Sequence, residues 1–361
     1  MKPLTCWVSV FGFSNSPEIP FGSQNSGFLD QRFALQWVQD NIKQFGGDPS
    51  RVMVFGESAG GESVKQLLAN PPTPMPFSSA ILQSQNAVIF GNGELNYKQV
   101  LTNFGCSDIN CLRQVPAADI KSYIETNSLS FPPVNGDGTS TQDVRLSITS
   151  SKFANVPILL GTDLNEARIF LAVAGLNDGS AALDNQFDSL NLTSPVIRDS
   201  IIASYAAKGI DDLYLVADRL GTDLVFTCTT ARLANYLALF GRTVYRYLYT
   251  PAFPNLSIFP DAGAYHSSEI PQVFGTYPLS NQHGSATQQQ IQLSAFMQKT
   301  WANFAKNPGS GAGWPKVGSV GPDLGVLGRD GGSGVTVMSK LEFDYACPIY
   351  APIEDLLGLS F

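Results

Sequence analysis

The stretch VMVFGESAGGESV, residues 52–64, places one serine between two glycines in the pattern Gly-x-Ser-x-Gly. An apolar run precedes it and a helix-forming run follows it, the strand–turn–helix context in which such a serine acts as a nucleophile. Gly56 and Gly60 let the strand and the helix approach closely while Ser58 adopts a strained backbone. We therefore predict that Ser58 is a catalytic nucleophile. The alternative, an ordinary turn, leaves a serine between two glycines unexplained.

A serine that attacks a carbonyl carbon also needs hydrogen-bond donors for the charge that develops on the carbonyl oxygen. The helix predicted to begin near Ala59 offers backbone N–H groups at its N-terminus. We predict that the N–H of Ala59 forms part of an oxyanion hole.

The chain contains two histidines that can serve as the general base for this serine. A base must be held rigidly and oriented by a carboxylate. His266 lies in GAYHSSEIPQVFG, flanked by ordered apolar sequence, whereas His283 lies in the polar loop SNQHGSA. We predict that His266 is the base and that His283 is a solvent-exposed loop residue.

The carboxylate that orients the base is expected between the serine and the histidine in the sequence. The segment NVPILLGTDLNEARIF, residues 155–170, has Asp163 and Glu166 just past the end of a predicted strand. Loops at the carboxyl ends of parallel strands are where such sheets place functional groups. The pattern does not choose between the two residues, and either of them is alternatively a helix cap.

The composition is that of a globular protein, with 43% hydrophobic residues and only 14% charged ones. The net charge is −8 and no basic cluster occurs, so we expect no nucleic-acid partner. We expect no stable membrane insertion either, because no apolar run reaches the ~18 residues of a membrane span. Cys6, Cys228 and Cys347 have no spacing typical of a metal site, and we expect no metal and no cofactor.

Apolar strands and amphipathic helices alternate along the chain, which predicts an α/β fold with a parallel sheet. We expect a more helical middle from about 180 to 240, and glycine-rich surface loops at 308–334. The predicted strands are 51–56, 78–84, 155–162 and 245–251, and the best-defined helices are 27–46, 60–70, 97–105, 111–124 and 289–307.

Several of these segments together resemble the type-B carboxylesterases, the family of cholinesterases and fungal lipases. The similar segments are FGFSNSPEIP, SGFLDQRFALQWVQDNIKQFGGDPSRVMVFGESAGG, SSAILQS, VPILLGTDLNEARIF, GAYHSSEIPQVFG and MQKTWANFAKNP with GWP. The resemblance runs from about residue 8 to the C-terminus. It implies a single α/β-hydrolase domain over 1–361, with a mostly parallel central sheet and helical insertions in the middle.

The resemblance also implies the roles of the site residues. The family's acid loop uses its glutamate, which carries over to Glu166 and leaves Asp163 as a neighbour. The order Ser58, Glu166, His266 then fits a triad that hydrolyses carboxylic esters through an acyl-enzyme intermediate, with a small-molecule ester as substrate. Glu57 and Glu269, which also lie inside these motifs, are expected to support the site residues or the fold.

Cys106 and Cys111 stand close together in CSDINC, where a disulfide would stabilise the chain by about 2 kcal/mol. The segment resembles the family's small disulfide loop. The sequons at Asn191 (NLT) and Asn255 (NLS) are glycosylation candidates if the chain enters the secretory pathway. Members of the family are extracellular, although the first residues show no signal-peptide pattern.

In the family a longer N-terminal part supplies the first strands and a glycine-rich oxyanion loop. We therefore expect an N-terminally truncated chain, with its first strands missing and residues 3–10 as an unprotected sheet edge. Losing one oxyanion donor typically lowers kcat by roughly 10²–10³, so activity is expected to be impaired. The alternative is a catalytically inactive fragment or a cholinesterase-like binding module.

Overall fold

The computed structural model describes residues 6, 8–85, 91–279 and 284–357. The described chain groups into two compact units. A helical unit takes the described residues of Met1–Ser50, Gln66–Phe77 and Val88–Ala154, and a sheet unit takes those of Arg51–Lys65, Ser78–Ala87 and Asn155–Phe361.

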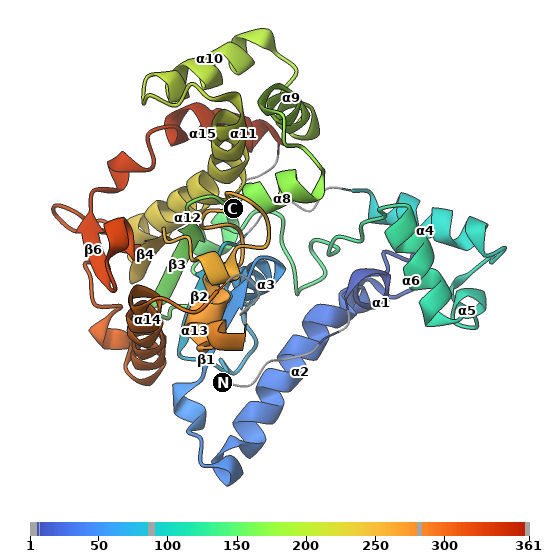
Figure 1. Ribbon diagram of the computed structural model, residues 1–361. Coiled ribbons are helices and arrows are strands. Elements are labelled where there is room, and N and C mark those ends of the chain that lie inside the picture. The colour runs from blue at the N-terminus through green and yellow to red at the C-terminus, as the bar shows by residue number, and fades with distance from the viewer. Residues whose placement is uncertain (1–5, 7, 86–90, 280–283, 358–361) are drawn as a thin grey trace. The chain divides into compact units, whose positions relative to one another are not determined.

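The sheet unit contains a central sheet of six strands within the described residues (Figure 1). The strands follow the order of the sequence: β1 (Met53–Glu57), β2 (Ser79–Gln83), β3 (Ile158–Asp163), β4 (Val244–Tyr249), β5 (Leu324–Leu327) and β6 (Val335–Met338). The first five are parallel, and β6 runs antiparallel to β5. The prediction of a mostly parallel sheet is confirmed.

The central strands β2, β3, β4 and β5 are buried along their whole length. Their near-continuous apolar sequences are typical of parallel strands that are covered on both faces. The register places Glu57 beside Gln83 and Gln83 beside Gly161, so β1, β2 and β3 end at the same edge. The residues that follow these three strands are therefore brought together at that edge.

Helices cover both faces of the sheet (Figure 1). Alternate residues of β4 point to opposite faces, so its side chains contact both layers. Tyr245 and Tyr247 contact Phe304 and Trp301 of α14, while Arg246 lies on the other side. The α-helices of this unit are α3 (Ala59–Ala69, of which residues 59–65 belong here), α8 (Arg168–Val173), α9 (Gly179–Ser189), α10 (Pro195–Ala206), α11 (Leu213–Thr222), α12 (Cys228–Leu239), α13 (Ile270–Phe274), α14 (Gln288–Lys306) and α15 (Cys347–Leu357).

Helices α9 to α12 confirm the predicted helical middle, and a π-helical turn, η4 (Asp223–Thr227), joins α11 to α12. The remaining short 3-10 helices of this unit are η5 (Pro254–Leu256), η6 (Tyr277–Leu279), η7 (Pro308–Ser310), η8 (Arg329–Gly331) and η9 (Lys340–Glu342).

The prediction that 308–334 consists of surface loops is wrong in part, because β5 lies within it and is buried. Its sequence, LGVL, has a glycine that weakens the strand pattern. A Cβ added at Gly325 would lie 2.6 Å from the ring of Trp314, so the glycine is what lets this strand pack.

The helical unit is built from α1 (Ser9–Gly12), α2 (Ser26–Asn41), α4 (Gly93–Asn103), α5 (Ile109–Leu112), α6 (Ala117–Thr126) and α7 (Arg145–Thr149), with η1 (Phe21–Ser23), η2 (Ile42–Phe45) and η3 (Pro49–Arg51). The predicted helix 27–46 is α2 continued by η2, and Gly46 ends it at φ +78°. Among the large apolar residues of this helix, Phe28 and Leu35 are buried, while Phe33 and Phe45 are exposed.

The expectation of an extended sheet edge at 3–10 is wrong in its described part. Residues 9–12 form helix α1 instead, and residues 1–5 and 7 lie outside the described chain. Local hydrogen bonds satisfy the backbone here, with the N–H of Phe13 donating to Ser9 at 2.8 Å. Val10 is buried in an apolar cluster with Tyr97 and Val100 of α4, so the segment packs against helices rather than against strands.

The described cysteines form two disulfides. Cys106 is bonded to Cys111 in the helical unit, and Cys228 of α12 is bonded to Cys347 of α15 in the sheet unit. The second bridge was not assigned from the sequence, and Cys6 is outside both bridges. Both pairs are consistent with an oxidising compartment.

The two sequons differ in accessibility. Asn191 is exposed, whereas Asn255 is buried, and its side-chain amide donates to the carbonyl of Tyr277 at 3.2 Å. Asn255 is therefore a poor glycosylation candidate in the folded chain, because a glycan would displace this packed side chain. Across the described helices, none has both the length and the apolarity required to cross a bilayer.

Candidate active site

The turn around Ser58 joins β1 to α3, with Ser58 between Glu57 and Ala59. Ser58 has φ +56°, a left-handed backbone that is strained for a residue with a side chain. Its N–H donates to the carbonyl of Gln83 at 3.0 Å, which ties the turn to the end of β2. Ala59 is exposed and begins α3, so its N–H belongs to the group that has no acceptor within the helix.

The glycines around Ser58 have different roles. A Cβ at Gly56 would lie 2.4 Å from backbone atoms of Gly60, so this position requires glycine. At Gly60 itself a Cβ would meet nothing within 4 Å, whereas at Gly61 it would lie 2.8 Å from the carbonyl oxygen of Gln83. The expectation that both glycines of the motif provide space is thus corrected: Gly56 and Gly61 do so.

Glu166 and His266 are brought together at the carboxyl edge of the sheet. Nδ1 of His266 lies 2.6 Å from Oε2 of Glu166. The other carboxylate oxygen, Oε1, accepts hydrogen bonds from the hydroxyl of Ser84 and from the N–H of Asp163, each at 2.7 Å. Glu166 is fully buried, so both of its oxygens are held in place.

The pattern of the sequence left Asp163 and Glu166 as alternatives, and the structure separates them. Asp163 ends β3, is fully buried, and accepts a hydrogen bond from the hydroxyl of Ser268 at 3.2 Å. Of the two candidates, Glu166 is the one that contacts His266.

The second nitrogen of His266, Nε2, lies 3.1 Å from the Oε1 atom of Glu57. Glu57 also accepts a hydrogen bond from the hydroxyl of Ser267 at 2.7 Å. Within the described part of the chain, no hydrogen bond joins Ser58 to the imidazole. The structure thus links Glu166 to His266 directly, and it places Ser58 next in sequence to Glu57, the carboxylate that Nε2 contacts.

The charges at this edge determine which groups carry protons. Burial lowers the pKa of His266, but the hydrogen bond and charge of Glu166 and the charge of Glu57 outweigh it and raise that pKa to about 9. Burial raises the pKa of Glu57 to about 7, although the charge of His266 opposes the rise. Burial also raises the pKa of Glu269, and burial together with the charge of Glu269 holds the pKa of Asp163 well above its usual range. At neutral pH the imidazole is therefore protonated in this arrangement.

Two aromatic rings flank the imidazole of His266. The ring of Phe226 lies 4.9 Å from it and the ring of Phe170 lies 5.3 Å from it, measured between centroids. The two phenylalanine rings also stack on each other at 6.2 Å. Phe226 is buried, whereas Phe170 is 49% exposed and faces solvent beside the base.

The sequence reasoning missed three residues that support the site: Gln83, Ser84 and Ser267. Ser84 and Ser267 have φ +47° and +76°, so both share the left-handed backbone of Ser58. Such strained residues cluster at functional sites. One signal was present in the sequence, since Gln83 and Ser84 are polar residues at the end of a buried strand.

Other expectations concern residues away from this cluster. His283 lies outside the described residues. Within the described chain, no group of three or more His, Cys, Asp and Glu side chains has the arrangement of a metal site.

Comparisons with known proteins agree with the geometry. A model of the carboxylesterase family matches residues 8–320. Secreted lipase 5 of Gibberella zeae is 30% identical over 339 residues, which cover 86% of this chain and 58% of the lipase. Chlorogenic acid esterase of Aspergillus niger is 30% identical over 87% of this chain and 56% of its own length. Fumonisin B1 esterase of Sphingopyxis macrogoltabida is 30% identical over 91% of this chain and 63% of its own length.

The chain therefore spans less than two thirds of the length of each of these relatives. The resemblance found in the sequence is confirmed, and with it the fold class. This chain belongs to the carboxylesterase family and has the family's α/β-hydrolase fold.

Proposed function

We propose that the protein is a serine hydrolase that cleaves carboxylic esters through an acyl-enzyme intermediate. Ser58 is the nucleophile, His266 the general base and acid, and Glu166 the carboxylate that orients the imidazole. The observation that carries the proposal is the 2.6 Å contact between Glu166 and Nδ1 of His266, beside a serine with a left-handed backbone at a strand-to-helix turn.

The first chemical step requires Nε2 of His266 to accept the proton of the Ser58 hydroxyl as its oxygen attacks the ester carbonyl. Nε2 contacts Glu57 in this structure, so the imidazole must lose the proton it carries there, and the Ser58 hydroxyl must take the place of Glu57 at Nε2. The N–H of Ala59 then donates to the oxygen of the tetrahedral intermediate. The protonated imidazole gives its proton to the leaving alcohol. A water molecule then attacks the acyl-enzyme, with His266 again as the base, and the carboxylic acid is released.

The proposed substrates are small carboxylic esters with apolar acyl groups. The half-exposed ring of Phe170 provides an apolar surface beside the base. The names of the relatives, a lipase and two esterases, support esters as the substrate class. Two disulfides and a relative named as a secreted lipase support an extracellular location.

Fluorophosphonate labelling of the purified chain tests the proposal, because this probe reacts with activated serines. We expect labelling of the wild-type chain, with ester turnover, and neither in Ser58→Ala. Glu166→Gln should label slowly, since the imidazole loses its orienting charge while the hydrogen bond is kept. Circular dichroism of each variant shows that the fold is intact.

Labelling that persists in Ser58→Ala contradicts the assignment of the nucleophile. A folded wild-type chain that neither labels nor turns over esters contradicts the enzyme proposal and favours the binding module.

A further inference from the structure

A π-helical turn between two consecutive helices packs against His266, the proposed general base. Helices α11 and α12 are continuous through η4, a π-helical turn in which the N–H of Cys228 donates to the carbonyl of Asp223, five residues back. A π turn holds one more residue than an α turn, so it rotates the residues that follow by about 100°. Such turns are frequently found at functional sites.

The side chain that this turn presents to the site is Phe226. Its ring lies 4.9 Å from the imidazole of His266 at an interplanar angle of 42°. Phe226 is buried, and its ring also stacks on that of Phe170, which itself contacts the imidazole. The hydroxyl of Thr229 contacts the carbonyls of two residues of this turn, Val225 at 2.8 Å and Phe226 at 3.1 Å.

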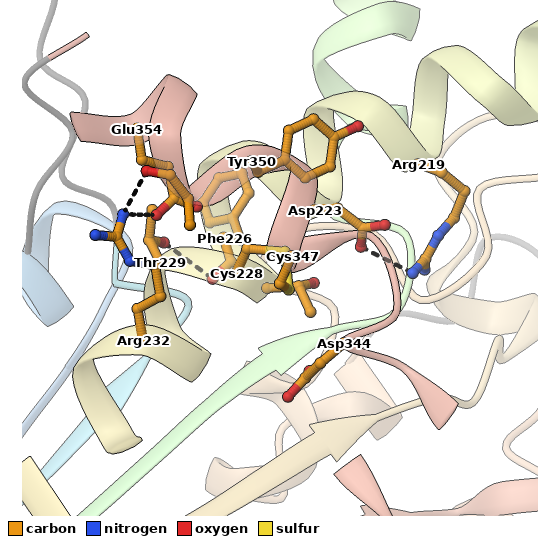
Figure 2. Close-up of a disulfide and its surroundings, with 12 residues drawn as sticks. Arg219, Asp223, Phe226, Cys228, Thr229, Arg232, Asp344, Cys347, Tyr350 and Glu354 are labelled. Carbon is orange, nitrogen blue, oxygen red and sulfur yellow. Dashed lines mark hydrogen bonds and ion pairs between the residues drawn. A yellow bond between two sulfur atoms is a disulfide. The ribbon is translucent and has the colours of Figure 1, made fainter. Parts of the chain in front are cut away.

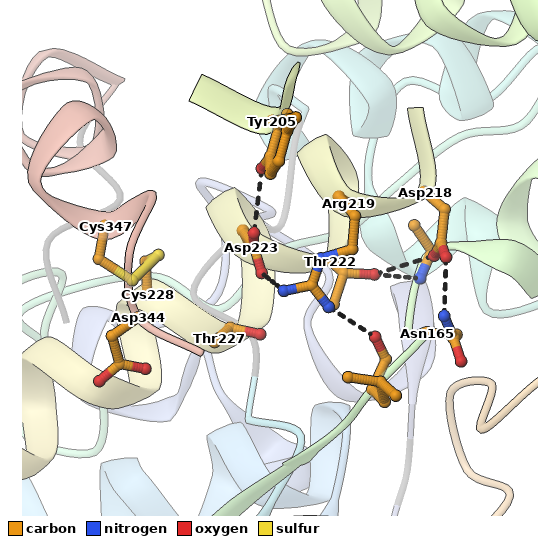
Figure 3. A network of polar contacts seen from close by, with 12 residues as sticks. Asn165, Tyr205, Asp218, Arg219, Thr222, Asp223, Thr227, Cys228, Asp344 and Cys347 are labelled. Atoms are coloured by element: carbon orange, nitrogen blue, oxygen red, sulfur yellow. Dashed lines mark hydrogen bonds and ion pairs between the residues drawn. A yellow bond between two sulfur atoms is a disulfide. The ribbon is translucent and has the colours of Figure 1, made fainter. Parts of the chain in front are cut away.

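The N-terminal side of the turn is anchored to the acid loop (Figure 3). Asp223 accepts hydrogen bonds from Arg219 at 2.8 Å and from the hydroxyl of Tyr205 at 3.0 Å. Arg219 also donates to the carbonyl of Leu164 at 3.0 Å, two residues before the triad glutamate. The N–H of Ala167, the next residue after that glutamate, donates to the hydroxyl of Thr222 at 3.1 Å.

The C-terminal side of the turn is anchored by the disulfide. Figure 2 shows Phe226 beside the bond between Cys228 and Cys347, with Tyr350 on the same helix as Cys347. The hydroxyl of Tyr350 lies 2.7 Å from that of Tyr205, which in turn contacts Asp223. Helix α15 therefore holds the turn from both ends, through one covalent bond and one hydrogen-bond chain.

We propose that Phe226 is a positioning residue for His266, held against the imidazole by the π-helical turn, and that the Cys228–Cys347 disulfide fixes this turn. The inference rests on the proposed serine hydrolase. The Phe226 ring limits rotation of the imidazole about its Cβ–Cγ bond. It also keeps water away from the contact between Nδ1 and Glu166. Because a weakly solvated charged hydrogen bond is stronger, this contact then holds Nδ1 firmly.

The variant that tests the positioning role is Phe226→Leu, and its matched control is Phe304→Leu. Phe304 is similarly buried, packs edge-to-face on Tyr245 on the opposite side of the sheet from Arg246, and belongs to an apolar cluster that contains none of the three triad residues. We expect Phe226→Leu to lower kcat on the order of tenfold, a part of the about 10²–10⁴ that a positioned base contributes. KM should change little, and the control should keep the kcat of the wild type.

A second measurement is independent of esterase activity. The chain has two histidines, so His283→Gln leaves His266 as the only source of imidazole signals. In this background, proton NMR should show a low-field resonance for the proton between Nδ1 and Glu166. We expect Phe226→Leu to broaden or abolish it by exchange with water, and Phe304→Leu to preserve it.

If Phe226→Leu keeps both this resonance and the kcat of the control, the positioning role is refuted. If the resonance behaves as expected while no variant turns over esters, the positioning role stands and the proposed function fails.

The role of the disulfide is tested by a double-mutant cycle with Cys228→Ala/Cys347→Ala. The combined variant carries Phe226→Leu together with both cysteine substitutions. If the bridge acts through Phe226, the combined variant loses no more kcat than the less active of its two parent variants. Losses that multiply show that the disulfide acts elsewhere, and they overturn this part of the proposal.

Discussion

Reducing the Cys228–Cys347 disulfide should destabilise the chain much more than reducing Cys106–Cys111. The first bridge joins residues 119 apart in the sequence, and cross-linking a loop of that length stabilises the folded state by about 5 kcal/mol in the chain-entropy model. The second bridge joins residues 5 apart, for which the same model gives about 2 kcal/mol. The expected difference is therefore about 3 kcal/mol.

The measurement compares oxidised and reduced chains, because reduction leaves all the sulfur atoms in place. Each bridge is studied in a chain whose other pair is replaced by alanines, and Cys6→Ser removes the remaining thiol. Urea unfolding is followed by tryptophan fluorescence and by far-UV circular dichroism, so that separate unfolding of the two units would be detected. The free energy of unfolding of the oxidised chain minus that of the reduced chain isolates the cross-link.

Equal losses for the two bridges, or a larger loss for the short one, would refute the loop-entropy reasoning. Such a result would mean that the stabilisation comes from local packing around each bridge. It would also weaken the view that α15 holds the π-helical turn through a covalent constraint.

The other predictions concern the site. Gly56→Ala should destabilise the chain by about 1–3 kcal/mol and abolish labelling, because the new Cβ meets the backbone of Gly60, whereas Gly60→Ala should be tolerated in denaturation and labelling assays. The value of kcat/KM should rise with pH up to about 9, because His266 acts only when it is unprotonated. Glu57→Gln removes a negative charge 3.1 Å from Nε2, so it should lower the pKa of His266 and shift this rise to lower pH. Asp163→Asn should change the free energy of unfolding by less than about 1 kcal/mol, because burial and the charge of Glu269 raise the pKa of this carboxyl and favour its neutral form; a larger loss by urea unfolding would refute this reasoning.

The sequence by itself determined the features that are written in contiguous residues. The turn around Ser58 is one, because a strand, a glycine-flanked serine and a helix start are all local patterns, and the structure has the strained backbone they predict. The parallel sheet is another, since each buried strand is a short apolar run. The family also follows from segments that are recognisable one by one.

Some features were hidden because a local pattern was weak or misleading. Strand β5 was missed because Gly325 interrupts its apolar run. The strand requires this glycine because a Cβ would collide with the ring of Trp314, a contact that the local sequence pattern does not reveal. Similarly, the resemblance to the family indicated a sheet edge at 3–10, but the side chain of Val10 packs among helices.

Only the tertiary structure decided which groups meet at the site. Strand order and loop geometry bring Glu166 rather than Asp163 to His266, and they place Glu57 at the second nitrogen of the imidazole. The bond between Cys228 and Cys347 likewise depends on how α12 and α15 pack. The physical reason is common to these cases: hydrogen bonds and disulfides act over a few ångströms, and spacing along the sequence carries no information about which distant residues come that close.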